Sequence, residues 1–179
     1  MKNNKIIFIT ILLFFINISS FGEEFNFKST EINVLEKGNL IIAEKGVKIE
    51  TQNNLIIEGE KSEYNKKKQT LKIIGNVKLY DKINNIIINS DNINYLKEKE
   101  LIFSEGKTVA EIENSYFVES IDLKFNRNSM EIYSKKKTSV KDTKGYYFSL
   151  DDFNFDIKKK FLKGKNVYLK DISNNEYNL

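Results

Sequence analysis

The side chains that could do chemistry in this 179-residue sequence are hydroxyls, carboxylates and amines, because cysteine and histidine are both absent. Without cysteine there is no thiol nucleophile, disulfide or thiolate metal site. Without histidine, the commonest general base near neutral pH and the commonest nitrogen ligand for metals are missing. Serine, threonine and tyrosine hydroxyls therefore lack an evident base, and no pair of acids stands out as suited to glycoside chemistry. The sequence predicts a binding protein, with no enzymatic activity and no cofactor.

Carboxylates recur along the chain near the expected starts of strands. They include Glu63, Asp91, Asp122 and the pair Asp151 and Asp152. Oxygen ligands of this kind suit Ca²⁺, but the sequence contains no loop of the EF-hand or RTX type. Capping of turns is the simpler interpretation, and we expect no metal site.

The charged residues are distributed evenly. The sequence has 29 basic and 25 acidic residues and a formal charge of +4. A nucleic-acid-binding protein concentrates basic charge on one face, whereas lysines and acids here are interspersed from end to end. We therefore expect no nucleic-acid partner.

The first 22 residues have the three parts of a cleavable export signal. Lys2 and Lys5 precede an apolar run, and Ser20 and Gly22 supply the small side chains that a signal peptidase requires. A retained membrane anchor is the alternative, but it would need about 20 apolar residues, more than this run provides. We predict a signal peptide at residues 1–22 and one mature domain at residues 23–179.

Apolar residues of the mature part alternate with polar ones over short stretches, which is typical of β-strands. Proline is absent, so nothing interrupts strand pairing. Glycines fall at expected turns. The alternating pairs are Val77 and Leu79, Ile93 and Tyr95, Leu123 and Phe125, Phe153 and Phe155, and Val167 and Leu169; the glycines are Gly38, Gly46, Gly75, Gly106, Gly145 and Gly164.

The chain also repeats with a period of about 30 residues. Tyr64, Tyr95, Phe125 and Phe155 are spaced by 31, 30 and 30 residues, and each precedes a polar, mostly lysine-containing turn. We expect each unit to contain two or three short strands and to bury its apolar face only against its neighbours. The units would form an elongated antiparallel sheet. The last unit stops partway through its period at Leu179, so we expect truncation there or an edge strand that pairs with a partner.

The inward apolar side chains have two interpretations. The simpler is a closed core, to which aromatic residues contribute large buried areas. The other is that the inner faces remain apart and line a trough for a lipid, while the lysine-rich turns either meet its phosphates or only keep the sheet margins soluble. The candidate lining residues in either case are Ile86, Ile88, Ile93, Tyr95, Phe117, Leu123, Phe125, Ile132, Phe153 and Phe155.

Three repeated motifs resemble a known family. They are Glu63-Tyr64-(x)10-Gly75-Asn76-Val77-x-Leu79, the later Ser90-Asp91-x-Ile93-x-Tyr95, and in outline Thr138-x-x-x-Asp142-x-x-Gly145-x-Tyr147-x-x-Leu150. Together they are similar to the N-terminal domain of the organic-solvent-tolerance (OstA) family, which includes the periplasmic lipopolysaccharide bridge LptA and the periplasmic part of the lipopolysaccharide-assembly protein LptD. The resemblance covers nearly all of the mature chain.

This resemblance implies a V-shaped, elongated β-jellyroll in the periplasm, associated with the outer membrane of a Gram-negative envelope. Its apolar groove would hold the acyl chains of lipopolysaccharide, and its ends would contact other jellyroll proteins of the transport bridge. The stretch from Thr138 to Leu179 looks most like LptD, in which a C-terminal outer-membrane barrel follows; this sequence has neither that barrel nor the cysteines that link it to the jellyroll.

Two alternatives remain open at this stage. One is a structural or adhesive β-repeat protein with a closed core and no lipid ligand. The other is an uncleaved, membrane-anchored family member resembling LptC. Facing sheets in full contact would favour the structural alternative, and splayed sheets would favour a lipid carrier.

Overall fold

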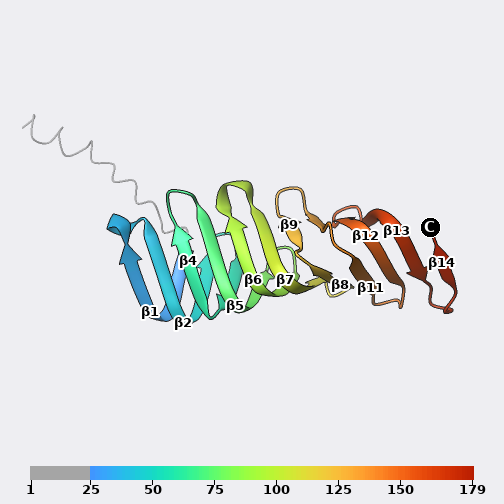
Figure 1. Ribbon diagram of the computed structural model, residues 1–179, viewed down its shortest axis with the longest axis horizontal. Coiled ribbons are helices and arrows are strands. Elements are labelled where there is room, and N and C mark those ends of the chain that lie inside the picture. Colours follow the sequence, from blue (N-terminus) through green and yellow to red (C-terminus); the bar gives the residue numbers. More distant parts are fainter. Residues whose placement is uncertain (1–24) are drawn as a thin grey trace, which may run out of the picture.

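The computed structural model describes residues 25–179; the expected signal peptide at residues 1–22 lies outside them. The described part is built from β-strands joined by turns, two of which are short 3₁₀ turns, η1 (Glu36–Gly38) and η2 (Lys97–Lys99). Every pair of neighbouring strands is antiparallel, which confirms the expected all-β antiparallel class. The strands lie side by side along the long axis, from β1 at one end to β14 at the other (Figure 1). They are β1 (Phe25–Leu35), β2 (Leu40–Thr51), β3 (Leu55–Gly59), β4 (Lys61–Asn65), β5 (Thr70–Asp81), β6 (Ile86–Leu96), β7 (Leu101–Ile112), β8 (Tyr116–Ile121), β9 (Lys124–Asn126), β10 (Glu131–Tyr133), β11 (Thr138–Asp142), β12 (Tyr147–Asp156), β13 (Phe161–Lys170) and β14 (Glu176–Asn178).

The two halves of each long strand belong to two different groups of paired segments, which are called half-sheet A and half-sheet B. The first half of β2 pairs with β4 and its second half with β3, and β5 divides between the same two partners. Farther along, the pairings of β7, β8, β11, β12, β10 and β9 close into a ring of six strands. Half-sheet A comprises residues 31–35, 40–44, 61–65, 70–74, 92–96, 101–105, 124–126, 131–133, 154–156 and 161–163; half-sheet B comprises residues 25–29, 47–51, 55–59, 77–81, 86–90, 107–112, 116–121, 139–142, 147–149, 165–170 and 176–178.

Glycines make the bends at which strands pass from one half-sheet to the other. Four of the six glycines that we expected at turns lie inside long strands instead: Gly46 in β2, Gly75 in β5, Gly106 in β7 and Gly164 in β13. The first three have positive φ, and the pairing of β5 with β6 shifts register beside Gly75. A bulge of this kind bends a strand without ending it. The repeats therefore combine long bent strands such as β5 and β7 with short ones such as β8 to β11, rather than containing short strands alone.

Gly106 offers a test of this bend. Its φ of +85° disfavours any side chain, and an added Cβ would collide with the Asp91 carboxylate. We expect Gly106→Ala to lower the free energy of unfolding in urea by about 2 kcal/mol, since left-handed backbone alone costs about 1–2 kcal/mol. Gly46→Ala is the matched control, because Gly46 has the same φ and no atom within 4 Å of its Cβ position. Equal losses in the two variants would exclude the collision with Asp91.

Buried serine and threonine hydroxyls lie next to the bends on successive strands. The Thr108 hydroxyl donates to Ser104 Oγ at 2.7 Å, and the Ser104 hydroxyl donates to the Leu123 carbonyl at 3.1 Å. Ser120 and Thr138 share a hydrogen bond of 2.8 Å. Bent strands leave carbonyl groups without a ladder partner, and a buried unpaired carbonyl is costly. The hydroxyls therefore satisfy the backbone along this side of the core.

Candidate functional site: the apolar interior

The repeated aromatic residues form one continuous row across half-sheet A. Residues paired on neighbouring strands point to the same face, so their side chains lie next to one another. The row begins on β1, crosses each strand in turn and reaches β13. It contains Val34, Ile41, Tyr64, Leu71, Tyr95, Ile102, Phe125, Ile132, Phe155 and Leu162.

A second row crosses half-sheet B and faces the first. It runs from β1 to β14 with one apolar residue on each strand, so the interior is apolar along the whole length of the domain. It contains Phe27, Ile49, Ile57, Leu79, Ile88, Ala110, Val118, Val140, Phe148, Leu169 and Tyr177.

Nine of the ten candidate lining residues lie in this interior and are at most 2% exposed. They are Ile86 and Ile88 in half-sheet B, and Ile93, Tyr95, Leu123, Phe125, Ile132, Phe153 and Phe155 in or beside half-sheet A. The tenth, Phe117, is 38% exposed, because its neighbour Val118 takes the inward position on β8. The structure therefore brings nine of them together and places Phe117 on the outer face.

The two half-sheets are in contact at two places along the domain, one of them at the β1 end. The Phe25 ring lies 4.6 Å from the Tyr64 ring and 6.1 Å from the Tyr95 ring, measured between centroids. Farther along, Tyr116 of half-sheet B lies 5.0 Å from Phe155 of half-sheet A. These cross-sheet aromatic pairs fill the space between the rows, so the interior is a closed core at both places.

The two ends of the interior are less covered. On β1, Ile32 and Val34 pair with the inward residues Ala43 and Ile41, yet they are 44% and 61% exposed. On β14, Tyr177 lies in the row of half-sheet B and is 43% exposed. Apolar side chains of the rows therefore reach the surface at both end strands.

Arg127 closes the interior along one side. It is the only arginine of the sequence and follows β9 in a turn of half-sheet A. Its Nε donates to Asp81 Oδ2 at 2.8 Å and its Nη1 to Glu100 Oε2 at 2.5 Å, while Nη2 donates to the Asn53 carbonyl at 3.3 Å. Asp81 belongs to half-sheet B and Asn53 to a turn that joins two of its strands, so the guanidinium connects the two half-sheets. Its side chain is 8% exposed and that of Asp81 is fully buried.

The pKa values of the groups in this cluster are shifted by burial and by the ion pairs. Burial alone would raise the pKa of Glu100, but hydrogen bonds from Lys97 and Arg127 outweigh it and lower that pKa. Burial would lower the pKa of Arg127, and its two carboxylate partners raise it instead. The Tyr95 hydroxyl is buried beside them, and burial together with the nearby Glu100 raises its pKa. The guanidinium and the Glu100 carboxylate are thus held in their charged forms.

A second ion pair joins the half-sheets next to Arg127. Lys160, in the turn after β12 of half-sheet A, pairs with Glu113 in the turn after β7 of half-sheet B. The Lys160 ammonium also lies 6.0 Å from the centroid of the Tyr116 ring, within range of a cation–π contact. Both partners are about two-fifths exposed, so this pair contributes less than the buried cluster.

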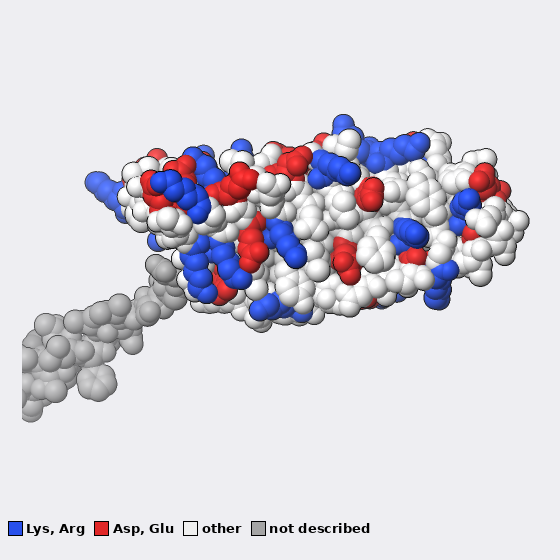
Figure 2. Space-filling view, turned by 90° about the horizontal axis from the view of Figure 1, so that it is seen from below, with Lys and Arg blue, Asp and Glu red and all other residues white. Residues whose placement is uncertain are grey.

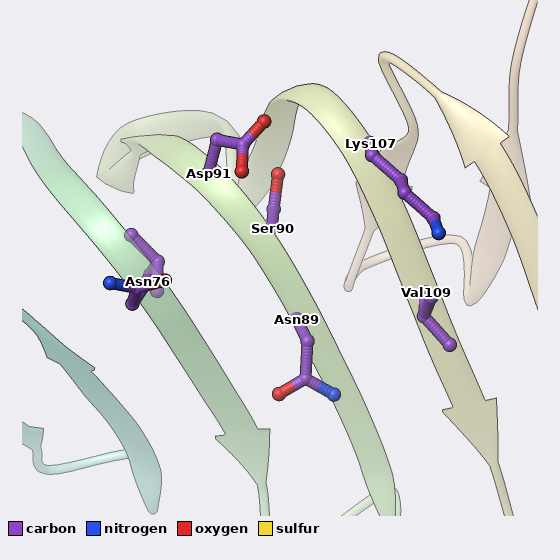
Figure 3. A pocket seen from close by; sticks show the side chains of 7 residues that line it. Asn76, Asn89, Ser90, Asp91, Lys107 and Val109 are labelled. Atoms are coloured by element: carbon purple, nitrogen blue, oxygen red, sulfur yellow. The ribbon is translucent and has the colours of Figure 1, made fainter.

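The outer surface has open depressions of mixed polar and apolar lining. One lies over β5, β6 and β7 near the bends and is lined by Asn76, Asn89, Asp91, Lys107 and Val109, among others (Figure 3). On the face shown in Figure 2, basic and acidic side chains lie among one another. Among residues 25–179, no group of three or more acidic side chains is placed to hold a metal ion.

The recurrent acids instead hold the bends together by hydrogen bonds. Asp122 Oδ1 accepts from the Gly106 amide at 3.1 Å, and Asp151 Oδ2 accepts from the Asn166 side chain at 2.9 Å. Asp91 packs against Gly106. These contacts give the carboxylates a structural role in the strands where the chain changes half-sheet.

Comparisons with known proteins leave the family open. No family model matches the sequence, and no curated protein is similar to it. One solved structure that aligns is the wild-type TCP10 domain of Danio rerio CPAP in complex with a peptide of Danio rerio STIL. The alignment covers 87% of this chain and 98% of that chain, with 11% identity and a TM-score of 0.17, a level at which the likeness carries no argument. Within the described range, no helix has the length and apolar character to cross a membrane.

Proposed function

We propose that this chain is a periplasmic β-jellyroll of the OstA type that binds the acyl chains of lipopolysaccharide and takes part in its transport to the outer membrane. The observation that carries the proposal is the pair of facing apolar rows. Each row has one apolar residue on every strand it crosses and runs the length of the domain without a charged residue. A pair of half-sheets joined at bends is what a V-shaped jellyroll requires.

Lipid transport needs an apolar path of this kind. Exposing an acyl chain to water costs about 0.8 kcal/mol per CH₂, so a chain of about 14 carbons needs roughly 10 kcal/mol of shelter during its passage. The sites along the path should also have similar affinities, since a deep trap would stop movement. The period of about 30 residues supplies Tyr64, Tyr95, Phe125 and Phe155 at equivalent positions in one row, which supports near-equal sites.

The two ends support contact with like jellyrolls. Among residues 25–179, β1 pairs only with β2 and β14 only with β13, so within this range each leaves backbone donors and acceptors free for a further strand. The apolar rows reach the surface at these same strands, through Val34 at one end and Tyr177 at the other. A second jellyroll added at either edge would extend both the sheet and its apolar interior. A C-terminal outer-membrane barrel, as in LptD, is the other partner that the resemblance suggests.

A structural β-repeat without a lipid ligand is the second candidate function. The closed core favours it, because the ring contacts between Phe25, Tyr64 and Tyr95 leave the half-sheets touching there. A lipid carrier with this core must open in order to load. The two candidates therefore differ in whether lipopolysaccharide ever reaches the buried rows.

Photo-crosslinking from inside the core separates the two. We expect the mature chain carrying p-benzoylphenylalanine at Phe155 to form an ultraviolet-dependent adduct with purified lipopolysaccharide. The same residue analogue at Phe117, on the outer face, is the matched control and should give little adduct. Phe155 is 2% exposed, so a micelle that only coats the surface cannot reach it.

Two outcomes would count against a lipid carrier. Equal adducts from Phe155 and Phe117 would indicate coating of the surface. No adduct from Phe155, with circular dichroism showing an intact fold, would favour the structural β-repeat.

A further inference from the structure

The two half-sheets are joined in different ways along the two long sides of the domain. On one side the strands themselves pass from half-sheet A to half-sheet B at bends such as Gly75 and Gly106. On the opposite side, which we call the mouth, turns of half-sheet A meet turns of half-sheet B. The A turns are at residues 36–39, 66–69, 97–100, 127–130 and 157–160, and the B turns are at residues 52–54, 82–85, 113–115, 143–146 and 171–175.

Backbone hydrogen bonds along the mouth stay within each half-sheet. The Lys97 amide donates to Gln69 and the Arg127 amide to Glu100, all in A turns, while the Lys82 amide donates to Asn54 in B turns. Within residues 25–179, no backbone hydrogen bond joins an A turn to a B turn. Separating the turns at the mouth would therefore break side-chain contacts and leave both ladders intact.

Arg127 is the strongest of the side-chain links across the mouth. Its guanidinium binds Asp81 and the Asn53 carbonyl on the B side while its own backbone and Glu100 hold it on the A side. A planar guanidinium can bind several oxygens at once, whereas the ammonium of lysine is a single point charge. The chain uses lysine for every other basic residue and arginine only here.

We propose that the mouth is a lateral gate to the apolar interior, with Arg127 as its latch. The half-sheets separate by bending at the glycine-containing bends, the Arg127 contacts with Asp81 and Asn53 break, and a lipid chain enters the facing rows from the side. Entry by this route rests on the proposed lipid-binding function. It explains how a core that is closed at Phe25, Tyr64 and Tyr95 could still admit a ligand.

Distances between spin labels across the mouth test the latch without any lipid. The sequence contains no cysteine, so labels go only where cysteines are introduced. With labels at Lys82→Cys and Asn128→Cys, on opposite sides of the mouth, we expect Arg127→Met to shift the separation to longer values and broaden it. Labels at Lys68→Cys and Asn128→Cys, both in half-sheet A, should keep their separation. If Arg127→Met does not fold, Arg127→Lys, which keeps the charge but not the planar fork, takes its place.

A covalent tether tests whether the lipid enters through the gate. Cysteines replacing Glu113 and Lys160 stand on opposite sides of the mouth, and a short bismaleimide can join them. We expect this tether to slow uptake of a fluorescent fatty acid by about tenfold or more, a ratio that corresponds to about 1.4 kcal/mol. The control tether joins Lys68→Cys and Glu98→Cys, which lie in neighbouring turns of the same half-sheet, and should leave uptake unchanged.

The outcomes separate the gate from the proposed function. A folded Arg127 variant with an unchanged label separation across the mouth would overturn the latch. Uptake at the same rate with and without the mouth tether would show entry from the ends and overturn the gate. If the untethered chain takes up no fatty acid and forms no adduct with lipopolysaccharide, the proposed function fails, while the label separations still decide whether the mouth opens.

Discussion

Replacing Arg127 with methionine is expected to lower the free energy of unfolding by about 3–5 kcal/mol, the cost of removing one partner of a buried ion pair. Asp81 has no exposed side-chain surface, and in the variant its carboxylate would keep only the contacts that Asn84 donates. Methionine preserves much of the apolar stem of arginine, so the loss comes mainly from the uncompensated charge. Urea denaturation monitored by circular dichroism measures it.

Lys48 supplies the matched control for this ion pair. It pairs with Glu58 at 2.9 Å on the outer face, and the two side chains are 40% and 48% exposed. Lys48→Met should therefore cost less than about 1 kcal/mol. Adding Asp81→Asn to Arg127→Met should recover part of the loss, because it removes the buried charge. If Arg127→Met and Lys48→Met lose equal stability, the Arg127 cluster does not stabilise the fold in the way we describe.

The strands and the core row could be predicted from sequence because their signal is local and repeated. Alternation marks the strands, and the 30-residue spacing of Tyr95, Phe125 and Phe155 identifies residues that the structure places in one row. The bends could not be predicted in this way. A glycine with positive φ is needed both in a tight turn and in a bulge, and only pairing with distant strands makes Gly75 a bend within β5.

The sequence could have pointed to Arg127 through its rarity, which a combined count of basic residues conceals. The sequence has 29 basic residues and only one is arginine. A chain that uses lysine at every exposed basic position has a physical reason to use arginine where several oxygens must be bound in a buried place. Its partners Asp81 and Asn53 lie 46 and 74 residues away, so their contact depends on the fold and could not be read from spacing.

Phe117 shows why alternation can mislead on β8. The residues Tyr116, Val118 and Ser120 alternate with Phe117, Glu119 and Ile121, and each set contains two apolar side chains and one polar. The phase of such a strand is ambiguous from sequence. The structure settles it through the bends, because the buried Ser120 hydroxyl hydrogen-bonds Thr138 there. Val118 therefore points inward and Phe117 outward.

Truncating Phe125 should cost far more stability than truncating Phe117. Phe125 is 1% exposed and sits in the row of half-sheet A between Ile102 and Ile132. Phe125→Ala removes a buried ring and leaves a cavity, at a cost of about 3–5 kcal/mol in the free energy of unfolding. Phe117→Ala removes the same ring from the outer face and should cost less than about 1 kcal/mol.

Urea unfolding of the two variants makes the comparison direct, since the chemical change is identical. Equal losses would mean that β8 presents Phe117 to the core, or that Phe125 can relax into solvent, and either result would contradict the inward and outward faces described above. A large loss only in Phe125→Ala would establish that the row of half-sheet A is close-packed at rest. In that case an acyl chain can reach Phe125 only if the half-sheets first move apart, which is the movement that the proposed gate supplies.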